Sequence, residues 1–256
     1  MRLVCLMVVK NEADRYLADC LWHHSRIWDE LFVYDDRSTD TTVEDASWFG
    51  DVTVRDESDV SFMEHEGDFR TEALSRCIFH YGLTKQDWIF ALDADEFLVS
   101  TQSGAHDTYL RTLINNCIYD AEVSGKRSVM IPIPELWRAD PASLRGDGFW
   151  NQMSLPRLYQ APGHFEDWAF MPKSMGCGSG PRYTYKDPLK QDALALLHMG
   201  YAVERDRETK FERYTSLENH GHNVRHINSI VEEPDLIPYK GAIPPILSDR
   251  VRRSPS

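Results

Sequence analysis

The feature that most constrains the fold is a series of short apolar runs that alternate with helix-like stretches. The first run is LVCLMVV, which follows Arg2 without a polar residue. A strand that is buried on both faces of a parallel sheet has this appearance. Further strands are predicted at residues 31–34, 52–54, 88–92, 128–133 and 193–198. Amphipathic helices are predicted between them at 12–28, 67–81 and 105–118, with a short helix from Asp40 to about Trp48. This order predicts an α/β fold in which helices flank a mostly parallel sheet, as in a Rossmann-like domain.

Beyond Pro132 the pattern changes. Proline, glycine and tryptophan are frequent up to about Pro188, and helical periodicity fades. We interpret this stretch as loops and short strands that lie over the edge of the sheet. A charged helix is then predicted at 203–220, and the residues from 243 onward are rich in proline and arginine, which is typical of a loose tail.

Composition limits the class of partner. The 256 residues fit one domain, and their formal net charge is −13. An acidic chain is a poor match for a broad nucleic-acid surface but suits a site that recruits a divalent cation. The five cysteines have no CxxC spacing, which favours reduced thiols, and no apolar stretch is long enough to span a bilayer. The apolar start reads as a first strand rather than a signal peptide, so we expect a cytoplasmic location.

Two acidic clusters follow predicted strands, at the edge where open α/β sheets bind ligands. Asp35 and Asp36 follow the second strand, and Asp93 and Asp95 follow the fourth. If the backbone stays extended, the side chains of Asp93 and Asp95 point the same way. Converging carboxylates are tolerated best with a cation between them, and Mg²⁺ or Mn²⁺ takes such ligands together with phosphate oxygens. The alternative is that both residues cap a helix that starts near Glu96.

Four motifs in order resemble family 2 glycosyltransferases, which have the GT-A fold. They are MVVKNEADRYL at 7–17, VYDDRSTDTT at 33–42, DFRTEAL at 68–74 and DWIFALDADEFL at 87–98. The resemblance is strong over about residues 1–100 and weak beyond. It implies a nucleotide-diphosphate-sugar donor, bound by a donor-binding half at 1–100, with an acceptor-side half at 101–242 and a flexible tail at 243–256.

The resemblance also implies roles for individual residues. Asn11 and Glu12 would line the nucleotide pocket, Asp35 and Asp36 would bind the base and ribose, and Arg70 would lie near the donor. Asp93 and Asp95 match the DxD motif that holds Mn²⁺ or Mg²⁺. Arg37 stands where the family usually has glycine.

The C-terminal half adds further candidates. His198 ends an apolar strand in LLHMGY, which resembles the element that supplies a third metal ligand in GT-A enzymes. Lys210 and Arg213 share a helix face, where they would clamp a diphosphate or form an ordinary solvated surface.

An inverting transfer needs a general base, for which Asp167 is the first choice and Glu166 the second. Other base candidates are Asp147, Asp140 and Glu135, and three tryptophans would stack on sugars or belong to the core: Trp137, Trp150 and Trp168.

Together with the resemblance to family 2, whose members are mostly inverting, these features predict a metal-dependent, inverting hexosyl- or pentosyltransferase that acts on an acceptor hydroxyl. One alternative is a nucleotide-sugar-binding module without transferase activity. A phosphatase of the haloacid-dehalogenase type is disfavoured, because Asp95 is followed by Glu96-Phe97-Leu98 and the motif follows three other strands. The acceptor is left open among a glycan, a small molecule, a protein and a modified DNA base. A DNA acceptor would need a basic groove, and the candidates for its lining are Arg138, Arg145, Arg157, Arg182 and Lys186.

Overall fold

A seven-stranded sheet forms the centre of the computed structural model, which describes residues 1–56, 62–101, 109–139, 141–147, 153–164, 167–170, 180–215, 224–241 and 244. The strand order is β10-β6-β9-β4-β1-β2-β3. Their bounds are β1 Leu3–Val9, β2 Glu30–Asp35, β3 Asp51–Val54, β4 Trp88–Ala91, β6 Ser128–Pro132, β9 Ser154–Gln160 and β10 Leu189–Lys190. Apart from β9, neighbouring strands pair in parallel, which confirms the predicted mostly parallel sheet.

β9 is the exception, and it corrects the interpretation of the segment that follows Pro132. It pairs antiparallel with both β4 and β6, so it lies inside the sheet rather than over its edge. Leu158 and Tyr159 of this strand are fully buried. Pro156 and the charged Arg157 interrupt its apolar pattern, and this is why the sequence resembles a loop there.

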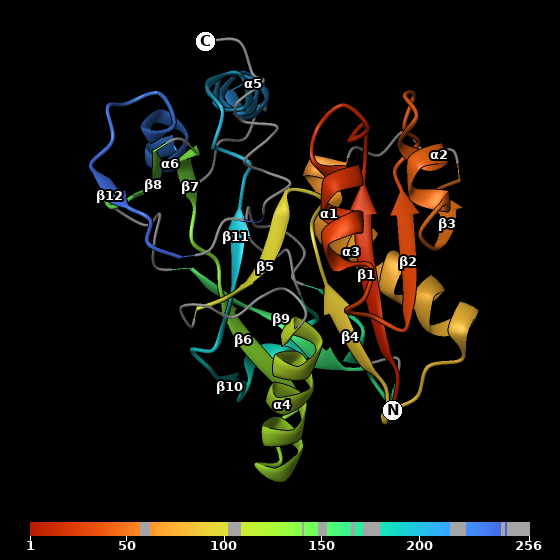
Figure 1. Ribbon diagram of the computed structural model, residues 1–256. Helices are drawn as coiled ribbons and strands as arrows, with labels where there is room; N and C mark the ends of the chain where they lie inside the picture. The colour runs from red at the N-terminus through yellow and green to blue at the C-terminus, as the bar shows by residue number, and fades with distance from the viewer. Residues whose placement is uncertain are drawn as a thin grey trace.

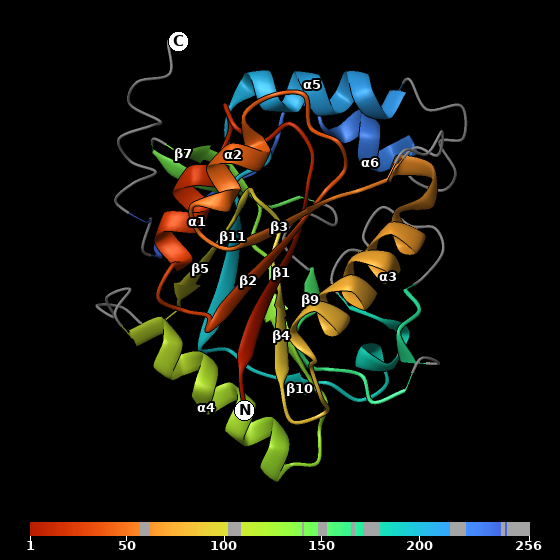
Figure 2. The same cartoon turned by 90° about the vertical axis from the view of Figure 1, so that its right-hand side faces the viewer.

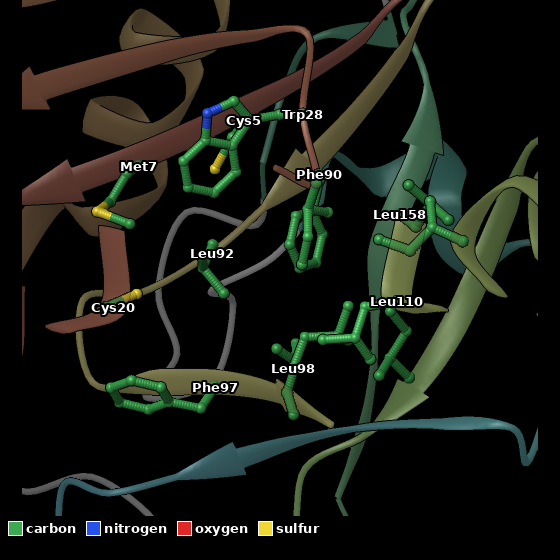
Figure 3. Packing of buried hydrophobic residues seen from close by; sticks show 14 of the residues in the cluster. Cys5, Met7, Cys20, Trp28, Phe90, Leu92, Phe97, Leu98, Leu110 and Leu158 are labelled. Carbon is green, nitrogen blue, oxygen red and sulfur yellow. The ribbon is translucent and has the colours of Figure 1, made fainter. Parts of the chain in front are cut away.

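Helices cover both faces of the sheet (Figures 1 and 2). The helix α3 (Phe62–Tyr81) packs on one face, and α1 (Leu17–His24), α2 (Thr42–Ser47) and α4 (Leu110–Val123) lie on the other. Cys20 of α1 and Leu110 of α4 belong to the same buried cluster as Phe90 of β4 (Figure 3). Residues of α3 such as Leu74 and Cys77 form a second cluster with Tyr159. The sheet is therefore buried on both sides, as its apolar runs require.

Three smaller groups of strands and helices complete the fold. β5 (Glu96–Ser100) pairs antiparallel with β11 (Leu194–His198). β7 (Leu136–Ala139), β8 (Ala142–Arg145) and β12 (Leu236–Pro238) form a third sheet. The helices α5 (Glu204–Thr215) and α6 (Val224–Ser229) and a short 3₁₀ turn (Arg182–Tyr185) are the remaining elements of the described residues. In both views α5 lies beyond the carboxyl ends of β1 and β2 (Figures 1 and 2).

Several helix boundaries differ from the predicted ones. α1 starts at Leu17 instead of residue 12, because Asn11 has a φ of 54° and the backbone N–H groups of Glu12 and Ala13 bond to Thr42 Oγ1. α3 starts earlier than predicted and bends at His65, whose φ of −132° is not helical. α4 begins later, at Leu110, and α5 ends at Thr215, beyond which residues 216–223 lie outside the described part.

The described tryptophans among the sugar-stacking candidates belong to the core. Trp137 is 2% exposed and stacks on Tyr201 with 5.7 Å between ring centroids. Trp168 is 7% exposed and packs edge-on against Phe79. Neither ring has a free face for a sugar, and Trp150 lies outside the described residues.

Two further sequence predictions, on the state of the cysteines and on membrane-spanning segments, can be compared with the described residues. Cys5, Cys20, Cys77 and Cys117 are free and buried, as expected for reduced core thiols. Cys177 lies outside this part of the chain. Within the described ranges, no helix has the length and apolar character that crossing a membrane requires.

His24 joins α1 to β5 from inside the core. Its side chain is fully buried, Nε2 accepts the Leu98 backbone N–H at 2.9 Å, and Nδ1 lies 2.7 Å from the Cys20 carbonyl oxygen. A neutral ring with its proton on Nδ1 satisfies both bonds. Burial, assisted by the neighbouring His23, holds the pKa of His24 well below its ordinary value.

This lowered pKa makes stability depend on pH. Below about pH 6.5 the unfolded chain protonates His24 and the folded chain does not, so stability falls as pH falls, by about 1.4 kcal/mol per pH unit from this group. Because the unfolded histidine is already half protonated at pH 6.5, we expect the wild type to lose about 1 kcal/mol more stability than His24→Gln between pH 6.5 and 5.5, as measured by urea unfolding. Equal pH slopes for the two proteins, or an NMR signal that shows the His24 ring titrating above pH 6, would contradict this assignment.

Candidate functional site

The DADE segment forms a tight turn between β4 and β5. The backbone N–H of Glu96 donates to the Asp93 carbonyl oxygen at 3.1 Å, and the Asp93 N–H donates to Glu96 Oε2, also at 3.1 Å. The prediction that the side chains of Asp93 and Asp95 point the same way required an extended backbone. The backbone between them forms a turn instead. The helix-capping alternative is also wrong, because a strand follows the turn.

Asp93 faces two arginines. Its Oδ1 lies 3.2 Å from Arg70 of α3, and its Oδ2 lies 3.0 Å from Arg157 of β9. Arg70 also pairs with Glu66 at 2.8 Å, and Arg157 with the buried Glu96. Burial disfavours the charged carboxylate, but the two guanidinium groups outweigh it and lower the pKa of Asp93. Both oxygens of Asp93 therefore have protein partners.

Asp95 faces a different set of side chains. Its Oδ2 lies 3.2 Å from His198 Nε2, 3.4 Å from Lys210 Nζ and 3.8 Å from Arg15. These three residues come from β11, α5 and the loop before α1, so the fold gathers distant segments around one oxygen. Burial opposes ionisation here too, but His198 and Lys210 hold the pKa of Asp95 well below its usual value.

His198 lies between two carboxylates. Nε2 faces Asp95, and Nδ1 contacts Glu135 Oε2. Burial alone would lower the pKa of His198, but Glu135 and Asp95 reverse this and raise it to about 10. In the absence of a bound cation, the ring is therefore an imidazolium with a hydrogen bond on each side.

The spacing at Asp95 fits a divalent ion. Ligand atoms about 2.1 Å from a metal and at right angles to each other lie roughly 3 Å apart. The 3.2 Å between Asp95 Oδ2 and His198 Nε2 matches this value. Among the residues that the structure describes, no three His, Cys, Asp or Glu side chains form a complete metal site. The arrangement thus suits Mg²⁺ or Mn²⁺, which complete their shells with phosphate oxygens and water.

The two loops that carry the predicted nucleotide-binding motifs are joined to each other by hydrogen bonds. Asn11 Oδ1 accepts the Thr39 backbone N–H at 2.8 Å, and the Asn11 N–H donates to Ser38 Oγ at 2.8 Å. These bonds and those to Thr42 join the loop after β1 to the loop after β2. Glu12 pairs with Arg15 at 2.9 Å. The two loops therefore form one wall beside the acidic turn.

Asp35 and Asp36 support this wall from inside. They are 0% and 2% exposed. The carboxylate of Asp35 accepts bonds from Ser38, which holds the turn in which Arg37 has a φ of 59°. Asp36 pairs with Lys10 at 3.0 Å and with Arg55 at 2.8 Å. The predicted contact of Asp35 or Asp36 with a base or ribose would need an exposed carboxylate oxygen. In this arrangement the oxygens of both residues are buried and bonded to protein groups.

The structure does not bring Asp167 to the acidic turn. Its carboxylate pairs with Arg127 at 3.3 Å, just before the start of β6. The backbone of Arg127 bonds to Gln160, and the next residue, Ala161, bonds to Asp87. Asp87 precedes β4 whereas Asp93 follows it, and six extended residues span roughly 20 Å. Asp167 therefore lies at the opposite end of β4, and Glu166 lies outside the described residues.

Several site residues were missed by the sequence prediction. Arg15 lies within the NEADRYL motif, but nothing in that motif indicated that it reaches Asp95. Arg157 was considered only for a basic groove, yet it is 3% exposed and neutralises Asp93 and Glu96. Arg145 is also fully buried and pairs with Asp147. Two of the five arginines and lysines proposed for a DNA groove are therefore internal.

Gly200 lies against the centre of the site. A Cβ added at this position would lie 2.6 Å from Asp95 Oδ2 and 2.7 Å from His198 Nε2, and would overlap Lys210 Nζ. The lysine tip can move aside, but the carboxylate and the imidazole are held by their other bonds. Glycine is therefore the only residue that lets the chain turn here without spreading Asp95 and His198.

We expect Gly200→Ala to weaken Mn²⁺ binding by about tenfold or more, with a stability cost of about 1–3 kcal/mol from overpacking. Titration of free Mn²⁺ by electron paramagnetic resonance (EPR) measures the affinity, and urea unfolding measures the cost. Gly163→Ala is the matched control, because its new Cβ would meet nothing closer than Lys85 Cβ at 4.0 Å. Unchanged Mn²⁺ affinity in Gly200→Ala would show that the site tolerates the added methyl group.

Comparisons with known proteins show only a weak similarity to solved structures. The sequence matches no protein-family model and no curated protein. The structure is similar to glucosyl-3-phosphoglycerate synthase from Mycobacterium tuberculosis, solved with Mn²⁺, UDP and glucosyl-3-phosphoglycerate, with 18% identity, a TM-score of 0.34, and coverage of 52% of this chain and 44% of that one. It is also similar to 4-diphosphocytidyl-2C-methyl-D-erythritol synthase, with 14% identity, a TM-score of 0.44, and coverage of 75% and 90%. The chain thus spans less than half of the first enzyme, and both TM-scores lie below 0.5.

Proposed function

We propose that the protein is a glycosyltransferase that moves a hexosyl or pentosyl group from a nucleotide-diphosphate-sugar donor to an acceptor hydroxyl, with Mn²⁺ or Mg²⁺ as cofactor. The observation that carries the proposal is that His198 and Lys210 both contact one oxygen of Asp95, beyond the end of a buried strand. A carboxylate and a histidine that can bind a metal ion, with positive side chains next to them, form an arrangement that stabilises a diphosphate leaving group. The ordered sequence motifs, which resemble family 2 glycosyltransferases, support the same chemistry.

Each residue has a distinct part in this proposal. Asp95 and His198 hold the ion, which when bound stabilises the negative charge that develops on the departing nucleoside diphosphate. Lys210 and Arg15 share Asp95 with His198, so their charges face the same diphosphate. Asp93 acts indirectly, because its two oxygens orient Arg70 and Arg157. The resemblance implied that Asp93 and Asp95 both bind the metal, whereas this proposal assigns the metal to Asp95 and not to Asp93.

The nucleotide would lie along the wall made by the loops after β1 and β2. Lys10 is a charged residue that the donor could reach there, since its side chain is 47% exposed although it pairs with Asp36, and Asn11 is exposed beside it. In this proposal Asp35 and Asp36 fix the shape of the wall instead of contacting the base. Arg70, held between Glu66 and Asp93, faces the donor from α3.

The nearest rival is a module that binds nucleotide sugars without transferring them. The two differ in turnover, because only an enzyme releases nucleoside diphosphate from a sugar nucleotide in the presence of Mn²⁺. Burial of Arg145 and Arg157 weighs against a DNA-base acceptor. Inverting stereochemistry and a cytoplasmic location stay predictions from the sequence.

A thermal-shift panel of nucleoside diphosphates with and without Mn²⁺ tests the proposal. Because a ligand that binds only the folded state stabilises it by mass action, by about 2.7 kcal/mol at a hundredfold excess over Kd, we expect one diphosphate to raise Tm in an Mn²⁺-dependent way. Asp95→Asn is expected to lose the Mn²⁺-dependent part. The matching sugar nucleotide then tests Mn²⁺-dependent release of the diphosphate.

Asp87→Asn is the matched control. Asp87 is also a buried carboxylate in an ion pair, with Arg2 at 3.2 Å, but it lies at the other end of β4. We expect it to lower Tm while keeping the full Mn²⁺-dependent shift. If Asp95→Asn responds to Mn²⁺ and nucleotide like the parent protein, Asp95 does not bind the metal and the proposal fails.

A further inference from the structure

Both ring nitrogens of His198 are engaged by carboxylates from different segments of the chain. Nε2 lies 3.2 Å from Asp95 Oδ2, and Nδ1 contacts Glu135 Oε2. Glu135 is only 4% exposed. A buried carboxylate carries a desolvation cost, so its position against one nitrogen of this ring calls for an explanation.

The backbone fixes this arrangement from two sides. The His198 N–H donates to the Pro134 carbonyl oxygen at 3.0 Å, and Glu135 forms a parallel bridge with His198. On the other side, His198 pairs with Glu96 in the β5–β11 ladder, and the Met199 N–H donates to the Asp95 carbonyl oxygen at 2.8 Å. The imidazole therefore lies between Asp95 and Glu135 as a consequence of strand register, not of a flexible side chain.

We propose that Glu135 is a positioning residue that holds His198 in the orientation and tautomer in which Nε2 faces the metal. This inference rests on the proposed function. An ionised carboxylate can only accept hydrogen bonds, so the single proton of a neutral ring is drawn to Nδ1. The lone pair of Nε2 is then directed toward Asp95, where it binds the same ion as the carboxylate.

The same geometry removes Glu135 from the candidates for the general base. Its Oε2 is occupied by His198, and the side chain is too deeply buried to reach an acceptor hydroxyl. A purely structural ion pair is the remaining alternative. Such a pair would affect the free energy of unfolding but leave the affinity for metal unchanged.

EPR titration with Mn²⁺ alone distinguishes these roles. We expect Glu135→Ala to weaken Mn²⁺ affinity about 10–100-fold, the usual effect of losing a carboxylate that orients a histidine ligand. Glu135→Gln is expected to recover part of the loss, because its amide oxygen still accepts the Nδ1 proton. Electron spin-echo modulation from ¹⁴N should report His198 on the ion in the wild type and weaken in Glu135→Ala.

Glu122→Ala is the matched control. It removes the carboxylate that accepts the Trp88 Nε1–H at 3.1 Å, so it is expected to cost stability without changing the ¹⁴N signal or the Mn²⁺ affinity. A folded Glu135→Ala that binds Mn²⁺ as tightly as the wild type would overturn the inference and leave the proposed function standing. A wild type that binds no Mn²⁺ would overturn both.

A measurement on the wild type covers the case in which Glu135→Ala does not fold. In Mg²⁺-loaded protein, ¹⁵N NMR of the His198 ring is expected to show the proton on Nδ1. A proton on Nε2 would show that Glu135 does not set the tautomer, and the inference would be wrong.

Discussion

Charge compensation around the turn from Asp93 to Glu96 is the constraint on which the rest of the structure depends. Three carboxylates lie at the end of a buried strand, and their desolvation is costly unless cations lie close. The chain supplies those cations from five separate segments, namely Arg15, Arg70, Arg157, His198 and Lys210. Each of these contacts ties one element to the turn, so the same interactions that neutralise the site also help to fix the positions of α3, β9, β11 and α5.

The acidic residues divide into two kinds by the partners they have. Asp35 and Asp36 are fully enclosed and shape a loop, although their sequence suggests a direct role in binding. Asp95 is partly exposed, and its three partners meet at one oxygen, which a divalent ion can share. Asp93 lies between these cases, since its charge orients two arginines. The proposed metal chemistry follows from this division rather than from the number of carboxylates.

The site is also built on rigid supports. His198 is held by strand pairing on both sides, Gly200 leaves room for the side chains that meet there, and the wall beside the turn is formed by two loops that bond to each other. A histidine ligand fixed in this way loses little conformational freedom when it binds a metal, which favours affinity. Glu135 belongs to this support in our reading, because it contacts the ring nitrogen that faces away from Asp95.

The sequence by itself determined the strands β1, β2, β3, β4, β6 and β11 and the helices that alternate with them, because continuous apolar runs and helical periodicity are local signals. It also predicted Asp95, His198 and Lys210 as candidate site residues, each from a short motif around its own position. Only the tertiary structure decided that β9 enters the middle of the sheet, that Arg157 neutralises Asp93, and that Asp167 lies at the far end of β4. Those facts depend on contacts between residues that are 22 or more positions apart, and no local pattern in a single sequence records which distant segments pair.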